Sequence, residues 1–199
     1  MAWDILNIIG TMAFAISGVI IALEEKYDLF GVYLLGFTTA FGGGMVRNLL
    51  LGLPISDIWQ QNMLFIIAFI TMTIIYIVPK NYLTNWLRAL PFFDAIGLGA
   101  FAVQGAMFAS HAGHPLIAVI VAGVLTGVGG GMIRDILAGR KPLVLHKEIY
   151  ALWAVLGAFV VGLDLFDETW QLVSVVFVIV VLRMLSVIYK WELPVRQYH

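Results

Sequence analysis

Seven apolar segments follow one another along the 199-residue chain, and most of them are close to 20 residues long. They cover residues 5–23, 30–51, 63–79, 93–110, 115–138, 149–166 and 170–190. A helix needs about 20 predominantly apolar residues to cross the hydrocarbon core of a bilayer. The alternation of lipid-facing and polar residues that a membrane β-barrel requires is missing. We therefore predict an all-α integral membrane protein with seven transmembrane helices.

Composition excludes several other classes of protein. Hydrophobic residues make up 62% of the chain and charged residues 12%, whereas a soluble domain carries about 25% charged residues. The balance of 11 Lys+Arg against 12 Asp+Glu offers no basic surface for nucleic acid. The chain has no cysteine, and His111 and His114 have no third ligand near them in the sequence. No nucleophile–base pair or phosphate loop is present, so we expect neither an enzyme nor a metal or other cofactor.

The distribution of Lys and Arg predicts the orientation in the membrane. If the N-terminus lies outside, the inner loops and the C-terminus carry eight cations and the outer loops carry none. The eight are Lys26, Lys80, Arg88, Arg140, Lys141, Lys147, Lys190 and Arg196. The other three, Arg47, Arg134 and Arg183, lie within apolar segments. Because cytoplasmic loops are enriched in Lys and Arg, we predict an outside N-terminus and a cytoplasmic C-terminus.

A pattern of glycines recurs along the chain at a constant offset. Gly10–Gly18 (GTMAFAISG) matches Gly97–Gly105 (GLGAFAVQG), and Gly36–Asn48 (GFTTAFGGGMVRN) matches Gly123–Asp135 (GVLTGVGGGMIRD). The offset is 97 − 10 = 123 − 36 = 87 residues. Each copy holds three predicted spans, so the second copy enters the membrane from the opposite side. We predict a single membrane domain over 1–199, with inverted repeats at about 3–80 and 90–166 and an added helix at about 170–190.

Each copy contains a glycine triplet in its second span. The triplets are Gly42, Gly43 and Gly44, and Gly129, Gly130 and Gly131. Glycine costs a helix about 1 kcal/mol relative to alanine, so three in succession should kink or unwind the second and fifth helices. In inverted-repeat membrane proteins, broken helices at corresponding positions mark substrate or ion sites near the midplane. The other interpretation is that the triplets serve only close helix packing.

An arginine follows each triplet. Arg47 stands before Asn48, and Arg134 stands before Asp135. An arginine near the bilayer centre costs about 2.5–3.5 kcal/mol even on the lenient insertion scale. Two such residues at matching positions therefore indicate a polar interior around both.

Further polar residues match across the two copies. Asp94 occupies the position of Asn7 in the first copy and is a candidate partner for either arginine. The other matching pairs are Ser17 with Gln104 and Thr39 with Thr126. Together these side chains would line a narrow polar path. Arg183 has no counterpart in the first copy, and we expect its long side chain to snorkel to the inner interface.

The doubled Gly-Gly-Gly-x-x-Arg-(Asn/Asp) element within seven spans resembles the prokaryotic branch of the trimeric intracellular cation (TRIC) channel family. Bacterial members of this group also carry the label "glycine transporter" domain. The resemblance covers about residues 3–190 and includes the start of the sixth span at Glu148-Ile-Tyr150. It implies a homotrimer in the lipid of the cell membrane, with one pore per protomer lined by the kinked second and fifth spans. It also implies that monovalent cations, chiefly potassium, pass beside Arg47, Arg134, Asn48 and Asp135.

Three functions remain open on this basis. The first is a passive channel for small monovalent cations that is gated at the glycine triplets. The second is a secondary transporter of glycine or a similar small solute, because two arginines near the midplane repel cations and suit a carboxylate. A cation channel would need Asp94 and Asp135 to neutralise them, or an arginine that acts as a gate and swings aside. The third is a membrane scaffold that transports nothing.

Overall fold

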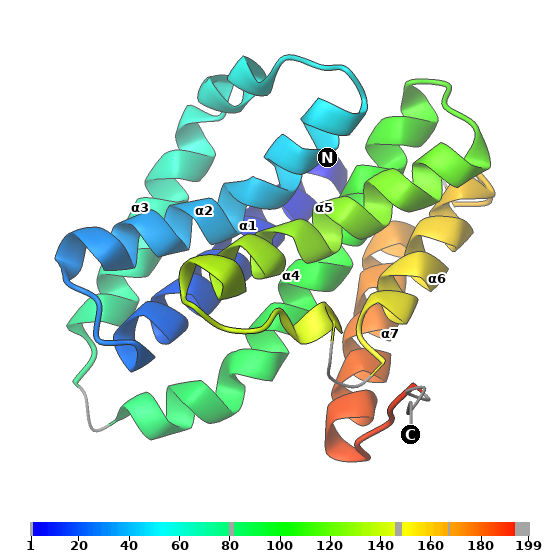
Figure 1. Ribbon diagram of the computed structural model, residues 1–199. Coiled ribbons are helices and arrows are strands. Elements are labelled where there is room, and N and C mark those ends of the chain that lie inside the picture. The colour runs from blue at the N-terminus through cyan, green and yellow to red at the C-terminus, as the bar shows by residue number, and fades with distance from the viewer. Residues whose placement is uncertain (1, 80–81, 146–148, 167, 194–199) are drawn as a thin grey trace, which may run out of the picture.

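The computed structural model describes residues 2–79, 82–145, 149–166 and 168–193. Within these ranges the chain is helical and contains no strand, which confirms the predicted all-α class. The α-helices are α1 (Ala2–Glu24), α2 (Leu29–Leu50), α3 (Asn62–Ile77), α4 (Leu83–His111), α5 (Leu116–Leu137), α6 (Ala151–Gly162) and α7 (Thr169–Ile188) (Figure 1). Two short 3-10 helices, η1 (Ile55–Gln60) and η3 (Leu143–Leu145), follow α2 and α5.

Five of these helices, α1, α2, α4, α5 and α7, are long and apolar enough to cross a membrane. The other two, α3 and α6, are apolar but have only 16 and 12 residues. At 1.5 Å per residue, a helix of 12 residues is about 18 Å long, which is shorter than a hydrocarbon core of about 30 Å. Crossing by α3 and α6 therefore stays a prediction.

The ends of α2 and α5 follow local chemistry, which repeats at the offset of 87 residues only where the two helices stop. Asp28 caps the start of α2, where its Oδ1 accepts a hydrogen bond from the Gly31 N–H at 2.8 Å. Just after α2 and α5, Gly52 and Gly139 have φ angles of 66° and 70°. Residues other than glycine rarely adopt such angles. The two helices thus stop at equivalent positions, since 139 − 52 = 87.

The predicted bounds differ most at α4. This helix begins at Leu83 rather than at residue 93, and it contains Pro91. Figure 1 shows α4 turning in its first half before it rises through the molecule. Proline removes a backbone hydrogen bond and crowds the preceding turn, so a helix that continues past it bends.

The packing of the first three α-helices recurs in the next three. In both sets the first helix packs against the second and third, and the second packs against the third. The two sets meet where α1 packs on α4 and α2 packs on α5. Phe14 and Phe101, which are 87 residues apart, contact each other inside the bundle with ring centroids 5.3 Å apart. The last helix, α7, packs mainly against α4.

Candidate functional site

The glycine triplets lie where α2 and α5 cross. A Cβ atom on Gly43 would overlap the carbonyl oxygen of Thr126, and one on Gly130 would overlap that of Thr39. These two contacts are equivalent under the repeat, because both residues of each pair shift by 87. Both helices are helical through their triplets, so they do not unwind there, and a kink at the triplets stays a prediction. The backbones approach more closely here than any side chain would allow.

The two matched threonines bond to their own helices. Thr39 Oγ1 donates to the Leu35 carbonyl, and Thr126 Oγ1 donates to the Ala122 carbonyl, both at 2.6 Å. Both threonines are buried. Each hydroxyl proton is therefore used within the helix, and only the oxygen lone pairs remain for any other partner.

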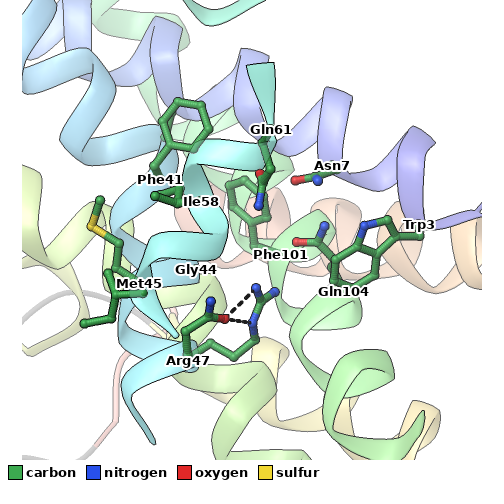
Figure 2. A pocket seen from close by; sticks show the side chains of 13 residues that line it. Trp3, Asn7, Phe41, Gly44, Met45, Arg47, Ile58, Gln61, Phe101 and Gln104 are labelled. Carbon is green, nitrogen blue, oxygen red and sulfur yellow. Dashed lines mark hydrogen bonds between the residues drawn. The ribbon is translucent and has the colours of Figure 1, made fainter. Parts of the chain in front are cut away.

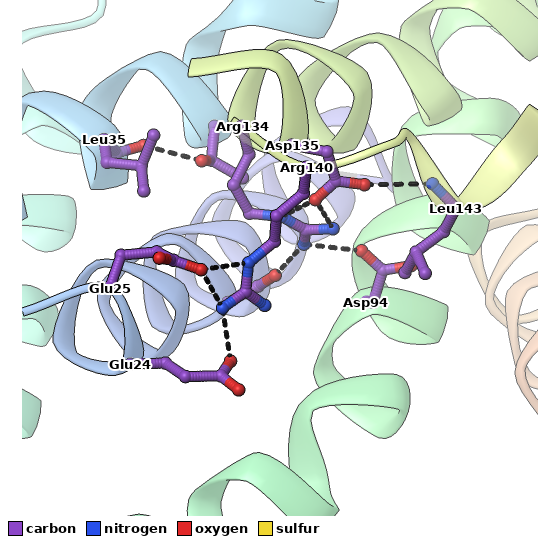
Figure 3. A network of polar contacts seen from close by, with 10 residues as sticks. Glu24, Glu25, Leu35, Asp94, Arg134, Asp135, Arg140 and Leu143 are labelled. Atoms are coloured by element: carbon purple, nitrogen blue, oxygen red, sulfur yellow. Dashed lines mark hydrogen bonds and ion pairs between the residues drawn. The ribbon is translucent and has the colours of Figure 1, made fainter. Parts of the chain in front are cut away.

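Arg134 is buried in a network of polar side chains (Figure 3). Its Nη1 donates to Asp94 Oδ1 at 2.8 Å and also to Ser17 Oγ. Its Nε and Nη2 both lie 2.8 Å from Asp135 Oδ1. The second oxygen of Asp135 accepts from the Leu143 N–H at 3.0 Å. The structure thus assigns Asp94 to Arg134, a choice that the sequence leaves open.

The Arg134 network has an excess of negative charge. Two carboxylates face one guanidinium, and the side chains of Asp94 and Arg134 are each only 1% exposed. Asp94 Oδ2 is buried as well. Buried charges are stable only when they are paired and hydrogen bonded, so the two acids and the arginine depend on one another.

Arg47, the repeat counterpart of Arg134, lies beside a pocket (Figure 2). Its Nε and Nη2 donate to Asn48 Oδ1 at 3.1 and 2.9 Å, which is the same arrangement that Arg134 has with Asp135. Asn48 is an amide, however, so this hydrogen bond brings no compensating charge. The pocket is small, with about 20 Å³ of free space, and has no acidic residue among those that line it. A space of this size holds about one water molecule.

The counterpart of this pocket at Arg134 is nearly closed. It has no room for a water molecule, and its lining includes Gly131, Met132, Arg134 and Asp135, the repeat counterparts of residues around Arg47. Gln104, the counterpart of Ser17, is buried and lines the Arg47 pocket. The two halves therefore differ in charge, and the Arg47 side has slightly more free space, although their sequences match.

Aromatic rings cover the Arg47 guanidinium, and sequence reasoning does not single them out. Arg47 Cζ lies 4.5 Å from the ring centroid of Phe108 and 5.6 Å from that of Trp3. A cation over an aromatic face gains about 0.5–2 kcal/mol. Trp3 is typical of an interfacial anchor by its place at a span end, and only the packing of α1 against α2 brings it to Arg47.

Arg183 does not snorkel as expected. It is 2% exposed, and its Cζ lies 4.7 Å from the ring centroid of Tyr150. Sequence position alone places it near a helix end, but in the structure it is enclosed, with the ring of Tyr150, just before α6, as one neighbour. Of the residues that support the orientation and the resemblance, Lys80, Lys147, Glu148 and Arg196 lie outside the described residues.

A separate ion cluster ties the end of α1 to the loop after α5 (Figure 3). Arg140 Nε donates to Glu25 Oε1 at 2.6 Å, and its Nη2 lies 2.7 Å from Glu24 Oε2. Burial acts to lower the pKa of Arg140, but hydrogen bonds to both glutamates outweigh it, so the pKa is raised. These side chains are about one third exposed, and such pairs contribute at most about 1 kcal/mol.

Comparison with known proteins decides the family. The family model described as Glycine transporter matches residues 4–80 and 91–163. A solved structure from work on the structural basis for conductance through TRIC cation channels is 41% identical to this chain. It has a TM-score of 0.85, and the match covers 100% of this chain and 99% of that one. The chain belongs to the TRIC family. This confirms the resemblance that the doubled glycine–arginine element predicts.

Other known proteins match this chain over nearly their full length. A prokaryotic TRIC channel crystallised in 0.5 M KCl is 34% identical, with a TM-score of 0.82 over 96% of this chain and 98% of that one. The UPF0126 membrane protein YvgT of Bacillus subtilis is 54% identical over 198 residues, which are 100% of this chain and 98% of YvgT. The UPF0126 inner membrane protein YadS of Escherichia coli is 38% identical over 195 residues, 94% and 92% of the two chains. The chain is thus a membrane protein whose structural neighbours are cation channels.

Proposed function

We propose that this TRIC family member is a channel for small monovalent cations such as potassium, with one pore in each protomer of a homotrimer. The observation that carries the proposal is the pairing of Arg134 with two carboxylates. A buried arginine repels cations unless its charge is compensated, and here Asp94 and Asp135 more than compensate it. Likeness over the whole chain to structures described as TRIC cation channels supports the same function.

The proposed path runs along the polar side chains that match across the repeats. They are Arg47, Asn48, Arg134, Asp135, Asp94, Ser17, Gln104, Thr39 and Thr126. We place the gate near Gly42–Gly44 and Gly129–Gly131, because the backbones of α2 and α5 come into direct contact there, at Gly43 and Gly130. The helix contacts that recur at the offset of 87 support two inverted repeats within one membrane domain.

The proposed orientation has the N-terminus outside, the C-terminus in the cytoplasm and the protein in the cell membrane. It places Ala112, between α4 and α5, outside, and Lys141, after α5, inside. The chain has no cysteine, so a single introduced cysteine is the only thiol in the protein that a maleimide can label. We expect Ala112→Cys to react with a membrane-impermeant maleimide on intact cells, and Lys141→Cys only after permeabilisation. Labelling of Lys141→Cys on intact cells, or labelling of Ala112→Cys only after permeabilisation, would contradict the seven-span orientation.

A second candidate function is secondary transport of glycine or a similar small solute. The observation that favours it is the small pocket at Arg47, where a cation faces no acidic residue. An arginine in this setting repels a permeating cation and attracts a carboxylate. The two functions use the same region of the molecule, and flux measurements separate them.

Proteoliposomes with the purified protein test the two candidates directly. Under a potassium gradient, a channel produces a current that rises with potassium without saturating. Under a gradient of labelled glycine, a transporter shows saturable uptake and counterflow. We expect the potassium current. Saturable glycine uptake without current would show that the protein is a transporter and not a channel. The absence of both signals would favour the third function, a membrane scaffold.

A further inference from the structure

The segment that follows α5 lies against the Arg134 network and closes it. Leu143 and Val144 of this segment line the same small space as Arg134 and Asp135, and that space has no room for a water molecule. The Leu143 N–H donates to Asp135 Oδ2 at 3.0 Å (Figure 3). We call residues 138–145 the cover, because they enclose the network at the end of α5.

A second set of contacts holds the cover from its outer side. Arg140, in the middle of the cover, donates from Nε to Glu25 Oε1 at 2.6 Å, and its Nη2 lies 2.7 Å from Glu24 Oε2 (Figure 3). The glutamates stand at the end of α1 and directly after it, so this contact joins the first repeat to the second. We call the three side chains the clasp. Beside it, the Tyr27 hydroxyl donates to the Leu137 carbonyl at 2.9 Å.

The first repeat lacks a counterpart of the clasp. The residues 87 positions away from the three members of the clasp are Leu53, His111 and Ala112. Leucine and alanine have no charge with which to form such an ion pair. The Arg47 side of the molecule also has slightly more free space than the Arg134 side. The charged contact therefore occurs in the half of the molecule where the buried arginine is fully enclosed.

The clasp is accessible to solvent, whereas the network beneath the cover is not. The side chain of Arg140 is 29% exposed and that of Glu24 is 37% exposed, but those of Arg134 and Asp135 are 1% and 4% exposed. Dissolved ions screen an exposed pair, because the Debye length falls from about 10 Å at 0.1 M salt to about 3 Å at 1 M. The clasp is therefore the part of this closure that conditions in solution can weaken.

We propose that the cover is a lid on the Arg134 network, and that the clasp determines how often the lid opens. When Arg140 separates from Glu24 and Glu25, residues 138–145 lose their ionic attachment to the end of α1. Opening then gives water and cations access to Asp135 and the side chains around it. The opening itself does not require that the protein conduct ions, whereas its effect on current rests on the proposed channel function.

A thiol beneath the cover reports opening without any ion flux. Val128 lines the space under the cover and is only 3% exposed, and the chain has no cysteine of its own. In purified Val128→Cys protein we would measure the rate of reaction with a methanethiosulfonate reagent by mass spectrometry. We expect the double change Glu24→Gln and Glu25→Gln to raise this rate at least about threefold, because an exposed ion pair contributes a modest free energy. Raising KCl from about 0.1 M to about 1 M should accelerate the reaction when the clasp is present and have little effect without it.

Matched variants separate the clasp from general effects of charge. Lys141 follows Arg140 in the cover, is exposed, and forms no ion pair among the residues that the structure describes. We expect Lys141→Gln to leave the labelling rate unchanged. Changing Arg140→Glu together with Glu24→Lys and Glu25→Lys rebuilds the clasp with reversed charges and should restore slow labelling. An unchanged rate in the folded double glutamine variant, or equal acceleration by Lys141→Gln, would overturn the proposal.

Potassium flux from proteoliposomes then tests the effect of the lid on conduction. We expect the variant with Glu24→Gln and Glu25→Gln to carry a larger potassium current than the wild type. Faster labelling with an unchanged current would show that the lid does not control the ion path, which would overturn its regulatory role. The absence of current from both proteins would contradict the channel function, while the labelling rates would still decide whether the clasp holds the lid.

Discussion

Replacing Arg134 with glutamine is expected to lower the free energy of unfolding by roughly 3–5 kcal/mol, the cost of breaking a buried ion pair from one side. The loss is large because Asp94 and Asp135 remain buried with no cation between them. Thermal unfolding of the purified protein in detergent measures the change. For a chain of this size we expect the melting temperature to fall by about 10 °C.

Two controls isolate the charge as the cause. Adding Asp94→Asn to Arg134→Gln removes one stranded carboxylate, and we expect it to recover part of the lost stability. The repeat-related change Arg47→Gln strands no acid, because Asn48 is its hydrogen-bond partner, and should cost much less. Equal destabilisation by Arg134→Gln and Arg47→Gln would show that the carboxylates are not what makes Arg134 necessary.

Adding a single methyl group at Gly43 is expected to separate α2 from α5. The new Cβ would overlap the backbone oxygen of Thr126, and a backbone atom within a helix cannot move aside as a flexible side chain can. Overpacking of this kind costs about 1–3 kcal/mol, and occasionally more. We expect Gly43→Ala to lower the thermal stability and to reduce potassium flux, since the proposed path runs along both helices.

The same triplet contains the matched control. A Cβ on Gly44 meets only Arg47 Nη2, at 3.9 Å, so alanine fits there and improves helix propensity by up to about 1 kcal/mol. We expect Gly44→Ala to be at least as stable as the wild type. If glycine is needed in the triplet for bending, both alanine variants impair flux; if it is needed for close packing, only Gly43→Ala does. Equal loss of stability in the two variants would contradict the packing explanation.

The comparison between the two triplet positions also shows where sequence reasoning stops. Three consecutive glycines predict a weak helix because each lowers propensity, yet α2 and α5 are helical throughout. The neighbouring helix stabilises them, and contact between Gly43 and the Thr126 backbone is possible only without a side chain. Local propensity contains no information about such a neighbour, so it predicts unwinding where the tertiary structure shows a crossing.

The early start of α4 has a similar origin. The apolar pattern indicates a span from residue 93, because Asn85 and Arg88 interrupt the hydrophobic run and Pro91 favours a helix boundary. In the structure the helix begins at Leu83 and contains that proline. Hydropathy predicts what crosses a membrane, whereas helical structure continues wherever backbone hydrogen bonds are satisfied.

The sequence by itself determined that this protein is helical and built for a membrane, and that two of its segments carry the same glycine–arginine element. These properties depend on the length of apolar runs and on internal matching, both of which are local. It also showed that Asp94 and Asn7 occupy equivalent positions. Only the tertiary structure decided that Asp94 binds Arg134 and that Arg47 faces a small pocket without an acid. Electrostatic pairing depends on distances of a few ångströms between helices, and those distances are set by how α1, α2, α4 and α5 pack together.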